Sequence, residues 1–311
     1  MRKSGLCDST LDVLLFVVWF LAFFNKLLDM QLRTYKTLWG HQGSFKTAAQ
    51  QAIDAGFNGI EGPVPVEPER IAALQDALAF HHLDYIAEVC TAGSYVPDRK
   101  AGMAEHLESL AQRLPIARQL GAKFITCIAG CDAWPLKQSI NFFERAMEMA
   151  ERERMIISFE THRSRTLFNP WITMEILERL PELKLTCDFS HWCVVCERLL
   201  DTEPEVLAKV YQHAHHIHAR VGYDQGPQVP HPAAPEYASA LLAHQNWWQL
   251  IWQSQQTRGY ETSTITPEFG PDGYLHVLPF SQTPVADLWE INCWMADTER
   301  AHFARLFNTV I

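Results

Sequence analysis

The sequence predicts a single-domain (β/α)8 TIM barrel, and three observations support this prediction. Short apolar runs of five to eight residues alternate with longer amphipathic runs, as in parallel strands joined by helices. This unit repeats eight times over about 275 residues, and eight is the number that closes such a sheet into a barrel. An open doubly wound sheet would need a glycine-rich phosphate turn after its first strand, where this chain reads only Gly40-His41-Gln42-Gly43.

The predicted elements follow from composition and periodicity. The strand candidates are rich in Ile, Val, Phe, Thr and Tyr. In chain order they are Tyr35–Gly40, Gly59–Pro63, Tyr85–Thr91, Phe124–Gly130, Met155–His162, Leu183–Ser190, His215–Val221 and Thr264–Gly270. The helix candidates space apolar residues three or four apart, and the first ends before Gly56, a good C-cap. They are Ser44–Ala55, Glu67–His81, Met103–Leu120, Leu136–Glu153, Trp171–Leu180, Glu203–His213, Pro235–Thr257 and Ala286–Leu306.

Composition narrows the class of protein. Of the 311 residues, 48% are hydrophobic and 20% are charged, which suits a globular chain with a sizeable core. The formal net charge of −10 argues against nucleic acid as a partner, because binding phosphates needs a basic face. Most of the eight cysteines sit in apolar runs, which predicts reduced, buried thiols and a cytoplasmic protein. Cys193 and Cys196 form a CxxC without a second such pair, so we expect a structural role rather than a zinc site.

Residues 1–29 form a hydrophobic extension that differs from the barrel expected at 30–311. The unbroken apolar run Val13–Phe24 has twelve residues, too few to cross a bilayer of about 30 Å at 1.5 Å per residue. No small-residue cleavage pattern follows it. Three interpretations stay open: a signal or membrane anchor through residues 11–28, an accessory helix packed on the barrel, or upstream sequence from a start codon misplaced ahead of Met30. Membrane contact is expected only in the first case.

Four consecutive predicted strands carry a metal-competent side chain near their carboxyl ends, where barrels place their functional residues. These side chains are Glu160, Asp188, His218 and Glu268. Residues two apart on a strand point the same way, so the polar residues share the face toward the barrel axis. The apolar residues between them can face the helices, namely Phe159, Cys187, Ile217 and Phe269.

Three converging carboxylates need compensation. They repel one another, and each costs several kcal/mol to bury unpaired, so that a divalent cation is favoured. The alternative is protonation, with pKa values raised by several units. A lone carboxylate at a strand end is more often a helix cap or a surface charge, but four ligands at one depth favour a metal site. Three carboxylates and an imidazole suit Mn²⁺, Mg²⁺ or Co²⁺, with Zn²⁺ also possible.

At these residues the chain resembles the xylose isomerase-like TIM-barrel superfamily of sugar isomerases and epimerases. The resemblance covers about residues 30–311. It is carried by the motifs Phe159-Glu160-Thr161-His162, Asp188-Phe189-Ser190-His191, His216-Ile217-His218 and Pro267-Glu268-Phe269-Gly270. It implies that Glu160, Asp188, His218 and Glu268 bind one divalent metal and that His191 touches a substrate oxygen. In the ketose 3-epimerase branch the two glutamates also act as the acid/base pair.

The chain departs from that branch at one position. The branch places an arginine six residues beyond the metal-binding histidine, where this chain has Asp224. Arg220 lies two residues beyond His218 and points to the same side, so it is our candidate to replace that arginine. His162 shares a face with Glu160 and is our further candidate for binding substrate. The long, Gly- and Pro-rich loop at 222–235 is a candidate cover for the substrate.

The expected activity is that of a metal-dependent isomerase or epimerase acting on a small carbohydrate-like molecule through an enediolate. A dehydratase shares the first step, so the residues leave it open as an alternative. A DNA-repair endonuclease of the same superfamily would hold three zinc ions, and the acidic balance disfavours it. The non-enzymatic alternative is a barrel in which the metal has only a structural role and holds the strands together. Four protein ligands on a metal that prefers six leave room for substrate, which favours catalysis.

Aromatic residues give two further expectations. Tryptophans near strand ends are candidates to pack against the C–H face of a sugar, although core packing is the more common role for any one of them. They are Trp39, Trp134 and Trp192. The apolar run at 247–252 is either a contact between subunits of a homo-oligomer or the helix face packed on the barrel.

Overall fold

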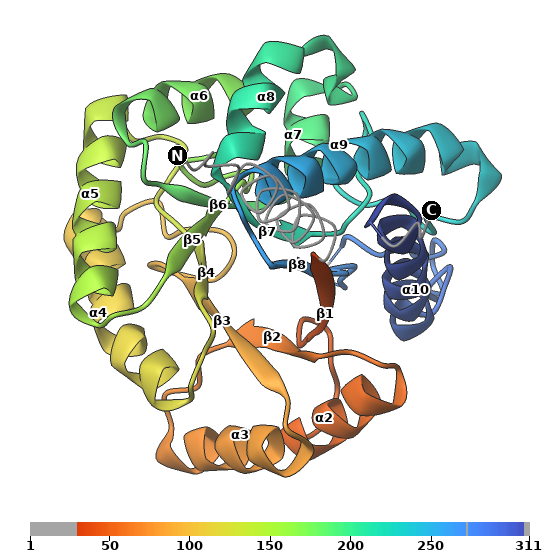
Figure 1. Cartoon of the computed structure of the whole chain (residues 1–311), viewed down its shortest axis with the longest axis horizontal. Coiled ribbons are helices and arrows are strands. Elements are labelled where there is room, and N and C mark those ends of the chain that lie inside the picture. Colours follow the sequence, from red (N-terminus) through yellow and green to blue (C-terminus); the bar gives the residue numbers. More distant parts are fainter. Residues whose placement is uncertain (1–29, 272, 308–311) are drawn as a thin grey trace, which may run out of the picture.

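The computed structural model describes residues 30–271 and 273–307. In this part of the chain, eight parallel strands close into one barrel in the order β1 to β8, and helices surround it (Figure 1). The predicted fold class is therefore confirmed. The strands are β1 Gln31–Thr37, β2 Gly59–Pro63, β3 Asp84–Cys90, β4 Ile125–Ile128, β5 Ile157–Glu160, β6 Lys184–Cys187, β7 Ala214–His218 and β8 Thr262–Thr266. The extension at 1–29, with the proposed anchor at 11–28, lies outside the described residues.

The helices largely follow the predicted ranges. They are α2 Phe45–Asp54, α3 Pro68–His81, α4 Met103–Gln119, α5 Leu136–Arg152, α6 Pro170–Arg179, α7 Phe189–Cys196, α8 Pro204–His213, α9 Ala238–Thr257 and α10 Leu288–Phe307, with 3-10 turns at Leu200–Thr202 and Pro235–Tyr237. The amino cap of α2 is Ser44, whose side chain accepts a hydrogen bond from the backbone N–H of Thr47. Among the described helices, none is long and apolar enough to cross a membrane.

Strands β5 to β8 end earlier than predicted, and one helix was not predicted. The sixth strand was expected to continue to Ser190, but it ends at Cys187. Asp188 then caps α7, because its Oδ1 accepts hydrogen bonds from the Ser190 N–H at 3.0 Å and the Ser190 hydroxyl at 2.5 Å. Asp188 is thus both a helix cap and a candidate ligand, and the cap fixes where its carboxylate lies.

The aromatic run on α9 packs inward. Trp248, Ile251 and Trp252 are fully buried and Trp247 is 3% exposed, so this run covers the barrel. That observation selects the second of the two roles predicted for it. The CxxC pair is likewise buried in α7, and the seven cysteines of the described chain are all free thiols.

The barrel axis contains a polar layer as well as an apolar one. Tyr35, Ile86 and Phe124 form a small apolar cluster of their own. A buried group of hydroxyls links the neighbouring strands β4, β5 and β6, with Thr186 donating to Ser158 at 2.9 Å and lying 3.3 Å from the hydroxyl of Thr126. Polar groups on the axis provide partners for a charged site at the mouth of the barrel.

Candidate metal centre and substrate cavity

The four predicted ligands converge at the carboxyl ends of β5 to β8. Ligand atoms of Glu160, Asp188, His218 and Glu268 all lie within 4.8 Å of one another. The Nδ1 atom of His218 lies 3.0 Å from Glu268 Oε2 and 3.7 Å from Glu160 Oε1. Each of the four residues is at most 5% exposed. The cluster is therefore a buried site rather than an acidic surface patch.

Unsatisfied atoms inside this cluster fit a metal ion. Glu160 Oε2 and His218 Nδ1 are buried and have no hydrogen-bond partner among the described residues. Such groups are rare in proteins, since an unpaired buried polar atom costs about 1–3 kcal/mol. Three carboxylates share one permanent cation, the guanidinium of Arg220, which pairs with Asp188 and Glu268, and they need further positive charge. A divalent cation would supply that charge and ligate both unpartnered atoms.

The pKa values of these residues reflect burial of the cluster and repulsion among its carboxylates. Burial raises the pKa of Glu160 to about 7, and the charges of Glu268 and Asp188 add to the rise while His218 opposes it. Burial also raises the pKa of Asp188. Burial alone would lower the pKa of His218, but Glu268, Glu61 and Glu160 raise it well above its usual value. Without a cation, the cluster thus tends to take up protons, which a metal ion would displace.

Arg220 reaches the cluster from beyond the end of β7. Its Nη2 lies 2.5 Å from Asp188 Oδ2, and its Nε donates to the Ser190 hydroxyl at 3.0 Å. Its Nη1 lies 3.6 Å from Glu268 Oε2. The guanidinium carbon also lies 4.9 Å from the centre of the Tyr274 ring. Arg220 therefore connects two candidate ligands to the wall of the adjoining cavity.

A cavity of about 320 Å³ opens beside the cluster. It borders two candidate ligands, Glu160 and Glu268, and two of the predicted substrate-binding residues, His162 and Arg220. The remaining lining residues are Trp39, Pro63, Val64, Glu88, Cys90, Gly93, Ser94, Tyr95, Arg113, Ile128 and Tyr274. The cavity has the size of a small-molecule site.

The third predicted substrate-binding residue lies behind the cavity wall. His191 is fully buried, and its ring centre is 3.9 Å from that of His162. Its Nε2 lies 3.7 Å from both Glu160 Oε1 and Asp188 Oδ2 and accepts a hydrogen bond from Arg220 at 2.6 Å. Burial, together with the neighbouring His162 and Arg220, holds the pKa of His191 well below its usual value. This structure makes His162, rather than His191, the histidine that faces the cavity.

The loops over the cavity are not the one predicted. None of the described residues 222–235 lines it, whereas Tyr95 and Tyr274 from the loops after β3 and β8 do. Buried Arg165 holds the first loop, donating to the backbone carbonyls of Thr91 at 2.6 Å and Tyr95 at 3.1 Å, and also to that of Ser94. In the loop at 222–235, buried Gln228 hydrogen-bonds with the backbone of Gly270, in the segment after β8.

Only one of the three candidate tryptophans faces the cavity. Trp39 lines it. Trp192 is fully buried and donates its ring N–H to the Leu167 carbonyl at 2.9 Å. Trp134 packs edge-on against His106, with ring centres 4.7 Å apart. These two tryptophans have the core-packing role.

Comparison with known families agrees with this geometry. A sequence model of the xylose isomerase-like TIM barrel matches residues 49–226, more than half of the chain. The chain belongs to this family. No protein with a curated description matches the sequence.

Solved structures similar to this xylose isomerase-like barrel share its fold at low sequence identity. A xylose isomerase-like TIM barrel protein from Mycobacterium smegmatis, solved with magnesium, is 12% identical, with a TM-score of 0.59 and coverage of 88% of this chain and 98% of that one. The probable 3-DHS dehydratase AsbF from Bacillus anthracis is 17% identical, with a TM-score of 0.55 and coverage of 87% and 98%. The 3-keto-D-glucoside 4-epimerase from E. coli is 12% identical, with a TM-score of 0.50 and coverage of 89% and 98%.

Two glutamates of this xylose isomerase-like barrel were not predicted to belong to the site. Glu61 on β2 is 1% exposed and hydrogen-bonds to two histidines of β7. Glu88 on β3 lines the cavity, and burial with the nearby charges of Glu268, Glu61 and Glu160 raises its pKa to about 8. The sequence signal that could have identified them is a glutamate among mostly apolar strand residues. It occurs on β2 and β3, whereas the prediction considered only β5 to β8.

Proposed function

We propose that this protein is a divalent-metal-dependent isomerase or epimerase acting on a small polyhydroxy carbonyl compound. The observation that carries the proposal is the convergence of three carboxylates and one imidazole, with two unpartnered buried atoms, on the wall of a small cavity. The partner is thus a carbohydrate-like small molecule. The net charge of −10 supports a small molecule over nucleic acid.

Glu160, Asp188, His218 and Glu268 would hold the metal. Oxygen-rich donor sets of this kind suit Mn²⁺, Mg²⁺ or Co²⁺, and Zn²⁺ is compatible. When bound, the ion would polarise a substrate carbonyl and stabilise the negative charge that develops on proton loss. Four ligands from the protein leave coordination positions open on a metal that prefers six. The fold shared with a protein solved with magnesium supports this assignment.

The proton transfers fall to the two glutamates that border the cavity. One of Glu160 and Glu268 would take a proton from the carbon next to the carbonyl, giving an enediolate, and the other would return a proton. His162 and Arg220 would hold substrate oxygens. Trp39 would pack against the C–H face of the substrate and exclude water.

A dehydratase is the second candidate, and Glu88 favours it. Expulsion of a β-hydroxyl from the same enediolate needs an acid that protonates the leaving oxygen. The carboxyl of Glu88 lines the cavity and suits this role, because burial raises its pKa, to about 8 in the metal-free protein. The fold shared with a probable 3-DHS dehydratase is compatible with this chemistry.

Incubation with a panel of ketoses in D₂O tests the proposal. An isomerase or epimerase incorporates deuterium from solvent into recovered sugar, whereas a dehydratase releases a keto product that absorbs in the ultraviolet. Changing Glu268→Gln should lower kcat by about 10²–10⁴-fold, because a positioned proton donor or acceptor contributes that much. Circular dichroism should show an intact fold for this variant. If no substrate exchanges or reacts, and metal removal only lowers the melting temperature, the metal has a structural role instead.

A further inference from the structure

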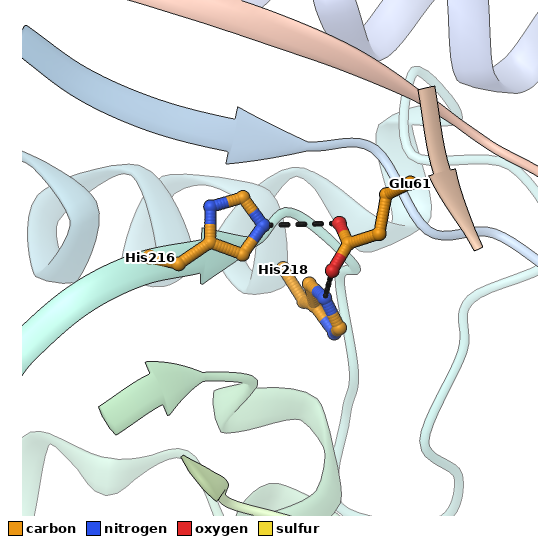
Figure 2. A group of neighbouring side chains, drawn as sticks. All are labelled: Glu61, His216 and His218. Carbon is orange, nitrogen blue, oxygen red and sulfur yellow. Dashed lines mark hydrogen bonds and ion pairs between the residues drawn. The ribbon is translucent and has the colours of Figure 1, made fainter. Parts of the chain in front are cut away.

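The carboxylate of Glu61 joins both axis-facing histidines of β7. Its Oε2 lies 3.1 Å from His216 Nε2, and its Oε1 lies 3.1 Å from His218 Nε2 (Figure 2). Glu61 comes from β2, which does not pair with β7, so this bridge crosses the interior of the barrel. All three side chains are at most 1% exposed, so water does not compete for these hydrogen bonds.

The bridge determines which nitrogen of His218 faces the candidate ligands. With Nε2 directed at Glu61, Nδ1 lies 3.0 Å from Glu268 Oε2 and 3.7 Å from Glu160 Oε1. An imidazole ligates a metal through a nitrogen that carries no proton, so the proton of a metal-bound His218 must reside on Nε2. Glu61 Oε1 is the acceptor that this N–H requires.

His216 holds Glu61 in place. Its Nδ1 lies 2.8 Å from the hydroxyl of Thr264 on β8, and its Nε2 engages Glu61. With one oxygen occupied by His216, the carboxylate of Glu61 has little freedom to rotate away from His218. Thr264, His216, Glu61 and His218 therefore form one hydrogen-bonded chain that ends at the metal-facing nitrogen.

We infer that Glu61 is a positioning residue that sets the tautomer and ring orientation of His218, so that Nδ1 is presented to a divalent metal. This inference rests on the proposed metal function and adds a residue that touches neither metal nor substrate. A carboxylate behind a metal-binding histidine typically strengthens metal affinity, and its loss costs about 10- to 100-fold.

The test is titration of the purified full-length protein with Mn²⁺ by calorimetry at fixed pH. Glu61→Gln keeps the size of the side chain but removes its charge, and Glu61→Asp keeps the charge but shortens the reach. The matched control is Glu299→Gln on α10, the same change at a buried glutamate that also pairs with a histidine, His302 at 3.1 Å, but belongs to no candidate metal cluster. We expect both Glu61 variants to raise Kd about 10- to 100-fold and the control to raise it far less.

A second readout follows the ligand itself. In Co²⁺-loaded protein, the visible absorption bands should shift in both Glu61 variants, because the imidazole changes its orientation, and should stay unchanged in Glu299→Gln. If Glu61→Gln fails to fold, the more conservative Glu61→Asp decides the outcome alone. Equal Kd values and unshifted spectra in wild type and Glu61→Asp would overturn the inference. If wild-type protein binds no divalent ion, the proposed function fails instead, so the two failures are distinguishable.

Discussion

Individual residues in the barrel mouth show how burial and charge compete. Glu88 is surrounded by other carboxylates, and burial with these charges raises its pKa to about 8. A raised carboxyl pKa means that the folded protein binds more protons than the unfolded chain between the ordinary pKa and about pH 8. Stability therefore falls as pH rises through that window, because the folded state increasingly has to lose this proton.

Replacing this carboxyl by its neutral counterpart should stabilise the metal-free protein. We expect Glu88→Gln to raise the free energy of unfolding by about 1 kcal/mol at pH 7, a modest value because the side chain lines an open cavity. The gain should shrink toward zero near pH 4, where Glu88 is protonated in both states. Urea unfolding at the two pH values measures this. A gain of equal size at both values would contradict the assigned cause.

Strand-end reasoning predicts the four candidate ligands but not their partners. Glu160, Asp188, His218 and Glu268 could be found because consecutive strands of a barrel place equivalent positions at one depth. The hydrogen bond between Glu61 and His218 joins residues 157 positions apart in sequence and crosses the barrel. The periodicity within one strand therefore cannot predict it. The alternation of side chains along a strand predicts which face a residue occupies. It does not predict which residue lies across the barrel from it.

At the scale of elements, the cavity depends on how the loops are held. Arg165 is fully buried and satisfies backbone carbonyls of the loop after β3 and the carbonyl of Gly130 after β4. Its rigid fork suits several carbonyls at once, which a lysine cannot match. Arg165 thereby keeps Tyr95 at the cavity wall.

Changing Arg165→Lys should weaken both the fold and substrate binding. Carbonyls left without a donor in a buried position cost about 1–3 kcal/mol each, so we expect a loss of at least about 2 kcal/mol in the free energy of unfolding. KM should rise more than kcat falls, because Tyr95 lines the cavity and is not one of the proton-transfer residues. The control is Arg99→Lys at an exposed ion pair with Asp132, with an expected loss of less than about 1 kcal/mol. Equal losses in the two variants would refute the role given to Arg165.

The boundaries of elements were predicted less well than their order. Polar and apolar residues still alternate past the last strand residue, as in Asp188-Phe189-Ser190 after β6, so the predicted strands run too long. Helix α7 was missed because Asp188 and Ser190 look like the end of a strand, whereas the carboxylate caps a new helix. The covering loop was missed because length and glycine content do not reveal which loop packs against other backbone.

For the whole molecule, four adjacent strands converge on one acidic site. A metal bound there would tie β5, β6, β7 and β8 together and relieve the repulsion among their carboxylates. Ligand binding to the native state alone stabilises it by about 2.7 kcal/mol at a free concentration one hundred times Kd. Binding of a metal at this site would therefore stabilise the barrel.

The most direct test of the central claim is the metal content of the purified chain after equilibration with Mn²⁺ and removal of free ion. We predict close to one ion per chain for the wild type and almost none for a variant carrying both Glu160→Gln and Asp188→Asn. A wild-type chain that retains no divalent ion, or a double variant that retains as much as the wild type, would contradict the account.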